Sequence, residues 1–505
     1  MVRLARLLGA VLLASPAISE LSSGHDHEYV PLPSEDPFYK IPPEAETAQP
    51  GTILKHRFLP SGVSAFGIPF DKFFSYKQQI LYRTTGQDGN AIATVLTVLV
   101  PQKPDYTKVV SLQVAEDTAS IDCAPSFGIL AASADHPRLD APTVKVHLLL
   151  AQAAFSRGWI IVIPDTAGPN AVFPAGKSAA YAVLDGVRAA LGSTSFTNIS
   201  NHADVALWGY SGGGSETLDA IRLQPTYAPE LKFKGAAFGG VTPYKRDLNQ
   251  AISVLNKGSS ANLIPVALLG QTANRPDMRM ALWLALKPEF RETFFQPLHQ
   301  CHDANKALFN NQDIIAMFDY LPAFLTYAIT HPLTSDSVDV NTAPPKNVPM
   351  YWYQLANDHL ADKDAIIKLV RQWCADGARI DFNLETFGGY HHAGYGLVGA
   401  PAAVRWLAEV LEGKAGSKTP SSRTPIESKA RYLTGSPAQR RYSTGQNSTG
   451  PSSTGLSSTG QKSPPLVMGG RCRSRKTSTP EVEQKYLEMF PKMLQESMKA
   501  FVDHV

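Results

Sequence analysis

The chain has 505 residues, 44% of them hydrophobic, and a formal net charge of +3. This length allows a large buried core and two or three domains. Residues 413–480 contain 12 Lys and Arg but one acid, a local charge of +11, which leaves the rest of the chain near −8. A mildly acidic body argues against nucleic-acid binding, because that function needs a positive surface.

The first residues have the layout of a secretory signal peptide. Arg3 and Arg6 precede an apolar run over residues 7–14, and small residues follow up to position 19. We therefore predict a signal peptide over residues 1–19 and a secreted, soluble protein. Stable membrane insertion is not expected, since no later segment reaches about 18 uninterrupted apolar residues.

Residues 20–242 are predicted to form the first part of an α/β core. Short apolar segments alternate there with segments of helical period. The predicted strands are 78–85, 91–100, 108–114, 159–165, 203–208 and 233–240, and the predicted helices are 143–158 and 181–191. Such alternation predicts a mostly parallel sheet with helices on both faces.

Residues 243–345 break this pattern and are predicted to form an all-helical cap or lid. Helical stretches such as 279–295 and 313–328 have no clear strand between them. The alternating pattern resumes over residues 346–412, the second part of the core. Its predicted strands are 348–356 and 379–385, and its predicted helices are 362–376 and 400–412.

Residues 413–480 are rich in Ser, Thr, Gly, Pro and Arg, with Ser-Thr-Gly recurring every five residues. Such a segment cannot bury enough apolar surface to offset the entropy of ordering it, so we predict a disordered linker. Residues 481–505 follow Pro480 and have apolar residues at helical spacing, which predicts a C-terminal helix.

Secretion would place the cysteines and the glycosylation triplets in an oxidising, glycosylating compartment. Four cysteines there are expected to form two disulfides, but the residues alone leave three pairings open, and no two have the close spacing of a zinc site. Asn198 and Asn447 begin Asn-X-Ser/Thr triplets and are predicted N-glycosylation sites. The cysteines are Cys123, Cys301, Cys374 and Cys472.

The stretch "VALWGYSGGGSET" places Ser211 in a G-x-S-x-G pattern between a predicted strand and a predicted helix. In that context the pattern predicts a nucleophile held at a sharp turn, where Gly209 and Gly213 are needed because side chains would collide. The helix that begins near Gly212 would direct its N-terminal dipole at a developing oxyanion. The alternative is a plain glycine-rich turn.

A serine nucleophile needs a histidine to accept its proton and a carboxylate to orient that histidine. In an α/β-hydrolase these residues follow the serine in the order acid, then histidine. The loop after the predicted strand 348–356 offers Asp358, whereas Asp362 and Asp364 fit the start of a helix. The loop "FGGYHHAGYG" offers His391 and His392, for which surface exposure without a chemical role is the alternative.

Several stretches in order carry a family resemblance: "AEDTASIDCAPS", "GWIIVIPDTAGP", "WGYSGGG" and "GLVGAPAAVRWL". On these the chain resembles the fungal secretory lipase family, the lipase A type of α/β-hydrolase, over about residues 36–412. The resemblance implies an α/β-hydrolase fold, with a mostly parallel sheet flanked by helices and an all-helical cap insertion.

The resemblance also implies site residues. The family's catalytic triad falls on Ser211, Asp358 and His392, with His391 open as the base because the loop differs in length by a residue. The oxyanion donors fall on the backbone amides of Asp117 and Gly212. By the same resemblance Cys123 pairs with Cys301, which leaves Cys374 with Cys472. This chemistry requires no cofactor and no metal.

The implied function is that of a secreted carboxylic ester hydrolase, a lipase that cleaves acylglycerols through an acyl-serine intermediate and acts at an oil–water interface. An esterase for small acyl groups on a secondary metabolite is the alternative within the same chemistry. A non-enzymatic surface protein with an inert hydrolase body is a second alternative. The sequence predicts neither the acyl-chain preference nor the oligomeric state.

Overall fold

The structure is a computed structural model that describes residues 29–241, 248–330, 344–386, 389–413 and 472–477. The predicted signal peptide, Asn447, most of the predicted linker and the predicted C-terminal helix lie outside the described residues. The chain divides into a short unit, Met1–Pro31, and a unit Leu32–Val505 that holds every element described below.

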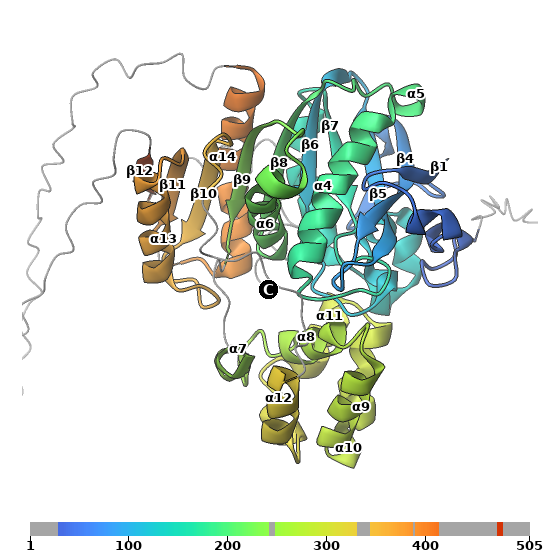
Figure 1. Cartoon of the computed structure of the whole chain (residues 1–505), viewed down its shortest axis with the longest axis vertical. Helices are drawn as coiled ribbons and strands as arrows, with labels where there is room; N and C mark the ends of the chain where they lie inside the picture. Colours follow the sequence, from blue (N-terminus) through green and yellow to red (C-terminus); the bar gives the residue numbers. More distant parts are fainter. Residues whose placement is uncertain (1–28, 242–247, 331–343, 387–388, 414–471, 478–505) are drawn as a thin grey trace, which may run out of the picture. The chain divides into compact units, whose positions relative to one another are not determined.

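A ten-stranded sheet forms the centre of the second unit, in the order β1-β4-β5-β7-β6-β8-β9-β10-β11-β12 (Figure 1). The pairs β1–β4, β4–β5 and β5–β7 are antiparallel, and every pair from β7 to β12 is parallel. The mostly parallel sheet that the sequence predicts is therefore confirmed. The strands are β1 (Ile53–Phe58), β4 (Phe74–Thr85), β5 (Ala91–Pro101), β6 (Asp105–Gln113), β7 (Trp159–Pro164), β8 (Asp204–Tyr210), β9 (Phe233–Gly239), β10 (Met350–Leu355), β11 (Ile380–Glu385) and β12 (Arg473–Thr477), and a separate hairpin pairs β2 (Ser64–Ala65) with β3 (Ile68–Pro69).

Helices cover both faces of the sheet. One hydrophobic core joins the strands to α2 (Pro142–Leu150), α3 (Gln152–Phe155) and α14 (His392–Leu411). A second core on the opposite face joins them to α4 (Gly176–Gly192), α6 (Gly212–Tyr227) and α13 (Lys363–Ala375). Because both faces are covered, the central strand β7 has every residue buried, which explains its continuous apolar sequence.

Short helices and 3-10 turns fill the connections between these elements. The short α-helices are α1 (Pro125–Gly128) and α5 (Thr194–Thr197). The 3-10 turns are η1 (Pro37–Tyr39), η2 (Pro43–Glu46), η3 (Asp71–Phe73), η4 (Ile121–Cys123), η5 (Ala131–Asp135), η6 (Pro137–Leu139), η7 (Gln296–His299) and η8 (Ile315–Met317).

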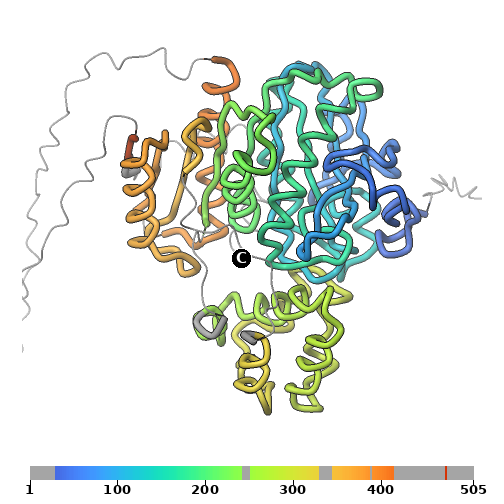
Figure 2. Tube along the Cα trace, in the orientation of Figure 1, coloured from blue at the N-terminus to red at the C-terminus, as the bar shows by residue number. Residues whose placement is uncertain are grey.

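The described residues between β9 and β10 form a helical insertion with a hydrophobic core of its own. In Figure 2 its yellow-green helices lie apart from the strands of the sheet. The predicted helix 279–295 is two helices, because Leu286 is extended and Pro288 starts a new helix, where its missing amide costs nothing. The helices are α7 (Leu248–Leu255), α8 (Leu263–Gln271), α9 (Pro276–Ala285), α10 (Pro288–Phe295), α11 (His302–Phe309) and α12 (Leu321–Thr330).

The prediction of a disordered linker over 413–480 is wrong for residues 473–477. These residues form β12, which pairs in parallel with β11, and the preceding Cys472 is bonded to Cys374 of α13. The sequence Arg-Ser-Arg-Lys-Thr has no apolar pattern that would reveal a strand. Backbone pairing and the disulfide hold it instead, and charged residues are typical of an edge strand.

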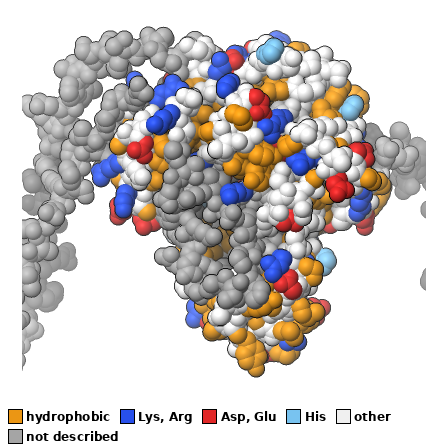
Figure 3. Space-filling view, viewed as in Figure 1, with side chains coloured by type: hydrophobic (Ala, Val, Ile, Leu, Met, Phe, Trp, Pro, Cys, Tyr) orange, Lys and Arg blue, Asp and Glu red, His pale blue; other side chains and the backbone are white. Residues whose placement is uncertain are grey.

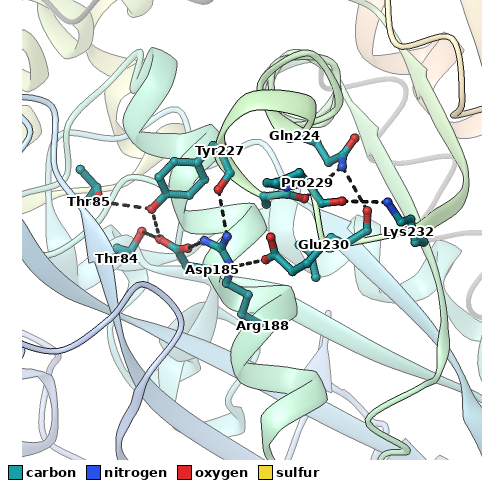
Figure 4. A network of polar contacts seen from close by, with 11 residues as sticks. Thr84, Thr85, Asp185, Arg188, Gln224, Tyr227, Pro229, Glu230 and Lys232 are labelled. Carbon is teal, nitrogen blue, oxygen red and sulfur yellow. Dashed lines mark hydrogen bonds and ion pairs between the residues drawn. The ribbon is translucent and has the colours of Figure 1, made fainter.

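A buried polar network ties α4 to β4 and α6 (Figure 4). The Asp185 side chain is completely buried and accepts hydrogen bonds from the hydroxyls of Thr84 and Tyr227, each at 2.8 Å. The Arg188 guanidinium donates to Asp185 at 2.7 Å and also to Glu230 at 2.7 Å. Burial raises the pKa of Asp185, and the Thr84, Arg188 and Tyr227 hydrogen bonds oppose that shift.

We expect Arg188→Met to lower the free energy of unfolding by about 3 kcal/mol, because it leaves a buried carboxylate without its cation. Urea denaturation followed by circular dichroism measures this loss. Arg157→Met, which removes an exposed pair with Glu412, is the matched control and should cost less. Equal losses in the two variants would contradict a special role for the buried pair.

Candidate active site

Ser211 lies at the turn between β8 and α6, in a backbone conformation that few side chains adopt. Its φ is 58° and its ψ is −123°. The Ser211 amide donates a hydrogen bond to the Gly239 carbonyl at the end of β9, at 2.9 Å. The turn is thus attached to the neighbouring strand, and a strained conformation of this kind persists only where its surroundings hold it.

The glycines on either side of Ser211 are required by close backbone packing. A Cβ atom on Gly209 would lie 2.1 Å from the Gly213 carbonyl oxygen. A Cβ atom on Gly213 would lie 2.1 Å from the Gln113 carbonyl oxygen at the end of β6. Any larger residue at either position would push the turn away from the sheet.

The imidazole of His392 lies between the hydroxyl of Ser211 and the carboxylate of Asp358. His392 Nε2 is 2.7 Å from Ser211 Oγ, and His392 Nδ1 is 2.7 Å from Asp358 Oδ2. Three segments that are far apart in the sequence meet here: the turn after β8, the loop after β10 and the start of α14. An imidazole in this position can accept the proton of the serine hydroxyl.

The backbone of His392 is held by the residue that precedes the serine. The Tyr210 hydroxyl donates to the His392 carbonyl oxygen at 2.6 Å. His392 is also the first residue of α14, eight residues before the helix start that the sequence predicts at 400. The helix thus positions the His392 ring. The low helix propensity of "HHAGYG" does not reveal that the helix begins there.

Asp358 is held by groups from its own loop and strand. Leu360 N donates to Oδ1 at 3.0 Å, and Gln354 Nε2 donates to Oδ2 at 3.2 Å. Burial alone would raise the pKa of Asp358. The hydrogen bonds from His392 and Leu360 N and the charges of His392 and His359 together outweigh burial, and the pKa lies below its usual value. An ionised carboxylate therefore faces Nδ1. Gln354, a polar residue in an apolar strand, was a signal that the sequence analysis missed.

The other sequence candidates have different places. His391 is the N-cap of α14, where its Nδ1 accepts from Gly394 N at 3.2 Å. Asp362 is the N-cap of α13 and accepts from Asp364 N and Ala365 N, at 2.9 and 3.1 Å. The structure thus brings His392 and Asp358 to Ser211 and uses His391 and Asp362 at helix starts.

Sequence reasoning also missed His359, which follows Asp358. Its ring centroid is 6.3 Å from that of His392. Its Nε2 lies 3.3 Å from Ser260 Oγ, a residue of the helical insertion. Burial and the nearby His392 lower the pKa of His359, so the ring favours its neutral form.

Asp117, which follows β6, lies beside the first residue of α6. Asp117 has φ 46°, a left-handed conformation that is uncommon outside glycine. A Cβ atom on Gly212 would lie 3.3 Å from Asp117 Oδ1 and 3.4 Å from the Cβ of Ala115. The two residues expected to supply oxyanion donors are therefore neighbours, next to Ser211.

The side chain of Asp117 faces two histidines. Burial raises the pKa of the Asp117 carboxyl, while the imidazoles of His302 and His392 act in the opposite direction. His302 is the first residue of α11 in the helical insertion.

The insertion is bonded to the segment that follows Asp117. Cys123 and Cys301 form a disulfide, and Cys301 is the N-cap of α11. Ala119, two residues after Asp117, packs in the hydrophobic core of the insertion. The insertion and this loop are consequently held together by a covalent bond and by apolar packing.

Two carboxyl groups close to this loop were not singled out from the sequence. Glu116 is buried, and burial raises its pKa to about 7. Glu216 of α6 has its Oε2 enclosed without a hydrogen-bond partner, and burial, followed by the charge of Glu116, raises the pKa of Glu216 well above its usual value. Their proximity could not be read from the sequence, where they are 100 positions apart.

Comparison with known proteins places the chain in a family. Residues 135–418 match the secretory lipase family. Lipase A of Arthroderma benhamiae is 36% identical over 75% of this chain and 80% of its own length. A probable trichothecene esterase of Stachybotrys chartarum is 32% identical over 77% of this chain and 79% of its own length.

The chain belongs to the secretory lipase family. It is a carboxylic ester hydrolase, rather than a non-enzymatic surface protein. Among solved structures, Candida antarctica lipase A in its closed state matches with a TM-score of 0.64 and 26% identity, covering 76% of this chain and 87% of that one. A rice cell wall degrading esterase from Xanthomonas oryzae shares the fold at 15% identity, with a TM-score of 0.51 over 72% of this chain and all of that one.

We expect Glu216→Gln to stabilise the protein at pH 7 but much less at pH 4. The folded-state pKa of Glu216 is raised, so the wild type loses stability as the pH rises above the unfolded-state pKa of about 4.3. Glutamine does not titrate, so we expect a gain in the free energy of unfolding at pH 7 that shrinks as the pH falls toward 4.

Urea denaturation at the two pH values measures this difference. Glu289→Gln, on the exposed surface of α10, controls for the loss of one charge. A gain for Glu216→Gln that is the same at pH 4 and pH 7 would show that titration of Glu216 is not its cause.

Proposed function

We propose that the chain is a secreted serine hydrolase in which Ser211 is the nucleophile, His392 the general base and Asp358 the residue that orients the base. The observation that carries this proposal is the hydrogen-bonded series from Ser211 through His392 to Asp358, with 2.7 Å at each step. The strained turn at Ser211 supports it, because it exposes the hydroxyl at the carboxyl end of β8.

In the proposed reaction His392 Nε2 removes the proton of Ser211 as Oγ bonds to the ester carbonyl carbon. The carbonyl oxygen becomes an oxyanion, which accepts hydrogen bonds from the backbone amides of Asp117 and Gly212. The imidazolium is stabilised by ionised Asp358 and gives its proton to the departing alcohol. Water, activated by the same imidazole, then attacks the acyl-enzyme and releases the carboxylic acid.

Ser211→Ala, His392→Ala and His391→Ala together test these assignments. We expect the first two to lower kcat on a soluble p-nitrophenyl ester by at least about 10³-fold, since nucleophile and base act as a unit. His391→Ala should retain kcat within about threefold, because His391 caps a helix. Fluorophosphonate labelling followed by mass spectrometry should place the adduct on Ser211. Full activity of Ser211→Ala would refute the proposal.

We propose acylglycerols as the substrates and an oil–water interface as the place of action, with residues 243–345 as the cap over the site. Relatives that are named lipases support this choice. In support, Met280, Trp283 and Leu284 on α9 are exposed to solvent, and hydrophobic side chains gather on the insertion in the lower part of Figure 3. Exposed apolar patches of this kind favour contact with an apolar phase.

A second candidate is an esterase for small acyl groups on a secondary metabolite. The relative named a probable trichothecene esterase favours it. Activity on p-nitrophenyl esters from acetate to palmitate, and on triolein emulsions, separates the two. For a lipase we expect kcat/KM to rise with chain length and Met280→Ser/Leu284→Ser to lose emulsion activity while keeping butyrate hydrolysis. Activity confined to acetate and butyrate would select the esterase.

Secretion is part of the same proposal. The predicted signal peptide over residues 1–19 and the two disulfides support it. Asn198, the predicted glycosylation site among the described residues, is exposed between α5 and β8. No helix in the described ranges has both the length and the apolar character needed to cross a bilayer.

A further inference from the structure

Glu116, the residue before Asp117, joins the loop after β6 to the loop after β7. Its Oε1 accepts three hydrogen bonds, from Thr166 N at 2.7 Å, from Thr166 Oγ1 at 3.0 Å and from Ala167 N at 3.2 Å. Glu116, Thr166 and Ala167 are all buried. A single side-chain oxygen thus satisfies two buried backbone amides. It also accepts from the Thr166 hydroxyl, which interacts with Glu216 as well.

The turn that follows Glu116 needs interactions that fix its backbone conformation. Asp117 is a non-glycine residue in the left-handed region, at φ 46°, and this conformation persists only where its surroundings determine it. On its far side, Thr118 Oγ1 accepts from Ser120 N at 3.0 Å, and Cys123 is bonded to Cys301. The hydrogen bonds of Glu116 fix the turn at its N-terminal end.

Acidic groups surround Glu116, yet they differ in their partners. Asp117, Asp165 and Glu216 are the carboxyls that interact with it, and the Tyr82 phenol also faces it. Asp165 accepts from Ser126 N and Ser126 Oγ, at 2.9 and 2.5 Å. Glu216 interacts with the Thr166 hydroxyl, and its Oε2 has no hydrogen-bond partner.

This arrangement limits negative charge near the place where an oxyanion would form. Burial raises the pKa of Glu116 to about 7, and burial together with the charge of Glu116 raises the pKa of Asp165 and of Glu216. A neutral carboxyl still accepts hydrogen bonds through its carbonyl oxygen. Glu116 can therefore hold Thr166 and Ala167 below neutral pH without a full charge beside the site.

We propose that Glu116 is a positioning residue of the oxyanion hole, which fixes the turn at Asp117 by anchoring it to Thr166 and Ala167. The inference rests on the proposed function, in which the Asp117 amide donates to the oxyanion. Glu116 itself touches neither the substrate nor the reacting atoms. Its effect is on the direction of one backbone N–H, and a small misplacement of a donor lowers the rate far more than it lowers substrate binding.

Glu116→Ala, Glu116→Gln and Asp185→Asn, with kcat and KM measured on p-nitrophenyl butyrate, test the proposal. We expect Glu116→Ala to lower kcat by about 30-fold or more while KM stays within about threefold, since the loss of an oxyanion donor costs about 10²–10³. Glu116→Gln keeps an acceptor oxygen and should stay within about threefold of the wild-type kcat. Asp185→Asn, which changes another buried carboxyl, in the network of Figure 4, should lower stability but not kcat.

A transition-state analogue gives a second measurement that a merely structural role would not change. A trifluoromethyl ketone bonds to Ser211 and places an oxyanion in the hole. Its inhibition constant should rise in Glu116→Ala by the same factor by which kcat/KM falls. A rise in KM with kcat unchanged, or an equal loss of kcat in Glu116→Ala and Asp185→Asn, would overturn the proposal.

If Glu116→Ala does not fold, Thr166→Val carries the test, because it removes one of the three donors. We expect its kcat to fall about tenfold, because the anchored turn loosens and misdirects the Asp117 amide, while KM stays within about threefold. A kcat within about threefold of the wild type would overturn the proposal. Fluorophosphonate labelling of Ser211 in the wild type keeps the two proposals distinguishable. If Ser211 is labelled but the Glu116 variants keep the wild-type kcat, only the positioning role of Glu116 is refuted. If Ser211 is not labelled, the proposed nucleophile is refuted.

Discussion

The left-handed turn at Ser211 is the constraint on which the rest of the site depends. The serine can hold φ 58° only because the Gly239 carbonyl accepts its amide and because glycines let β6, β8 and α6 approach one another. The packing of the parallel strands therefore decides where the hydroxyl points. The loops after β6 and β10 and the start of α14 then bring the other side chains to it.

Ser211 and His392 are coupled through Tyr210, which lies between them in the fold. Tyr210 precedes Ser211, and its hydroxyl binds the carbonyl of His392, so the turn that presents the serine also holds the histidine. Tyr210, the first x in G-x-S-x-G, thus holds the backbone of His392. His359 adds a contact from the loop of Asp358 to Ser260, and this loop consequently meets the helical insertion as well as His392.

The sequence predicts the parts of this site that local patterns of residues determine. It does not predict the parts that depend on contacts between residues far apart in the chain. The G-x-S-x-G turn and the apolar strand β7 are visible because glycine and continuous burial leave local signals. The strand β12 leaves none, since pairing with β11 and the bond between Cys472 and Cys374 hold a charged sequence. Nor could spacing decide between His391 and His392, because the start of α14 depends on packing against the sheet. Glu116 and Thr166 are likewise brought together by the adjacent parallel strands β6 and β7.

The disulfide between Cys123 and Cys301 spans 178 positions of the chain. Cys123 follows closely after Asp117, yet its partner belongs to the insertion and is synthesised much later. A nascent chain that ends before Cys301 can therefore build the strands up to β9 without locking the loop that contains Asp117. During biosynthesis, the residues of the Ser211 turn therefore emerge before the cysteine that can fasten the neighbouring loop.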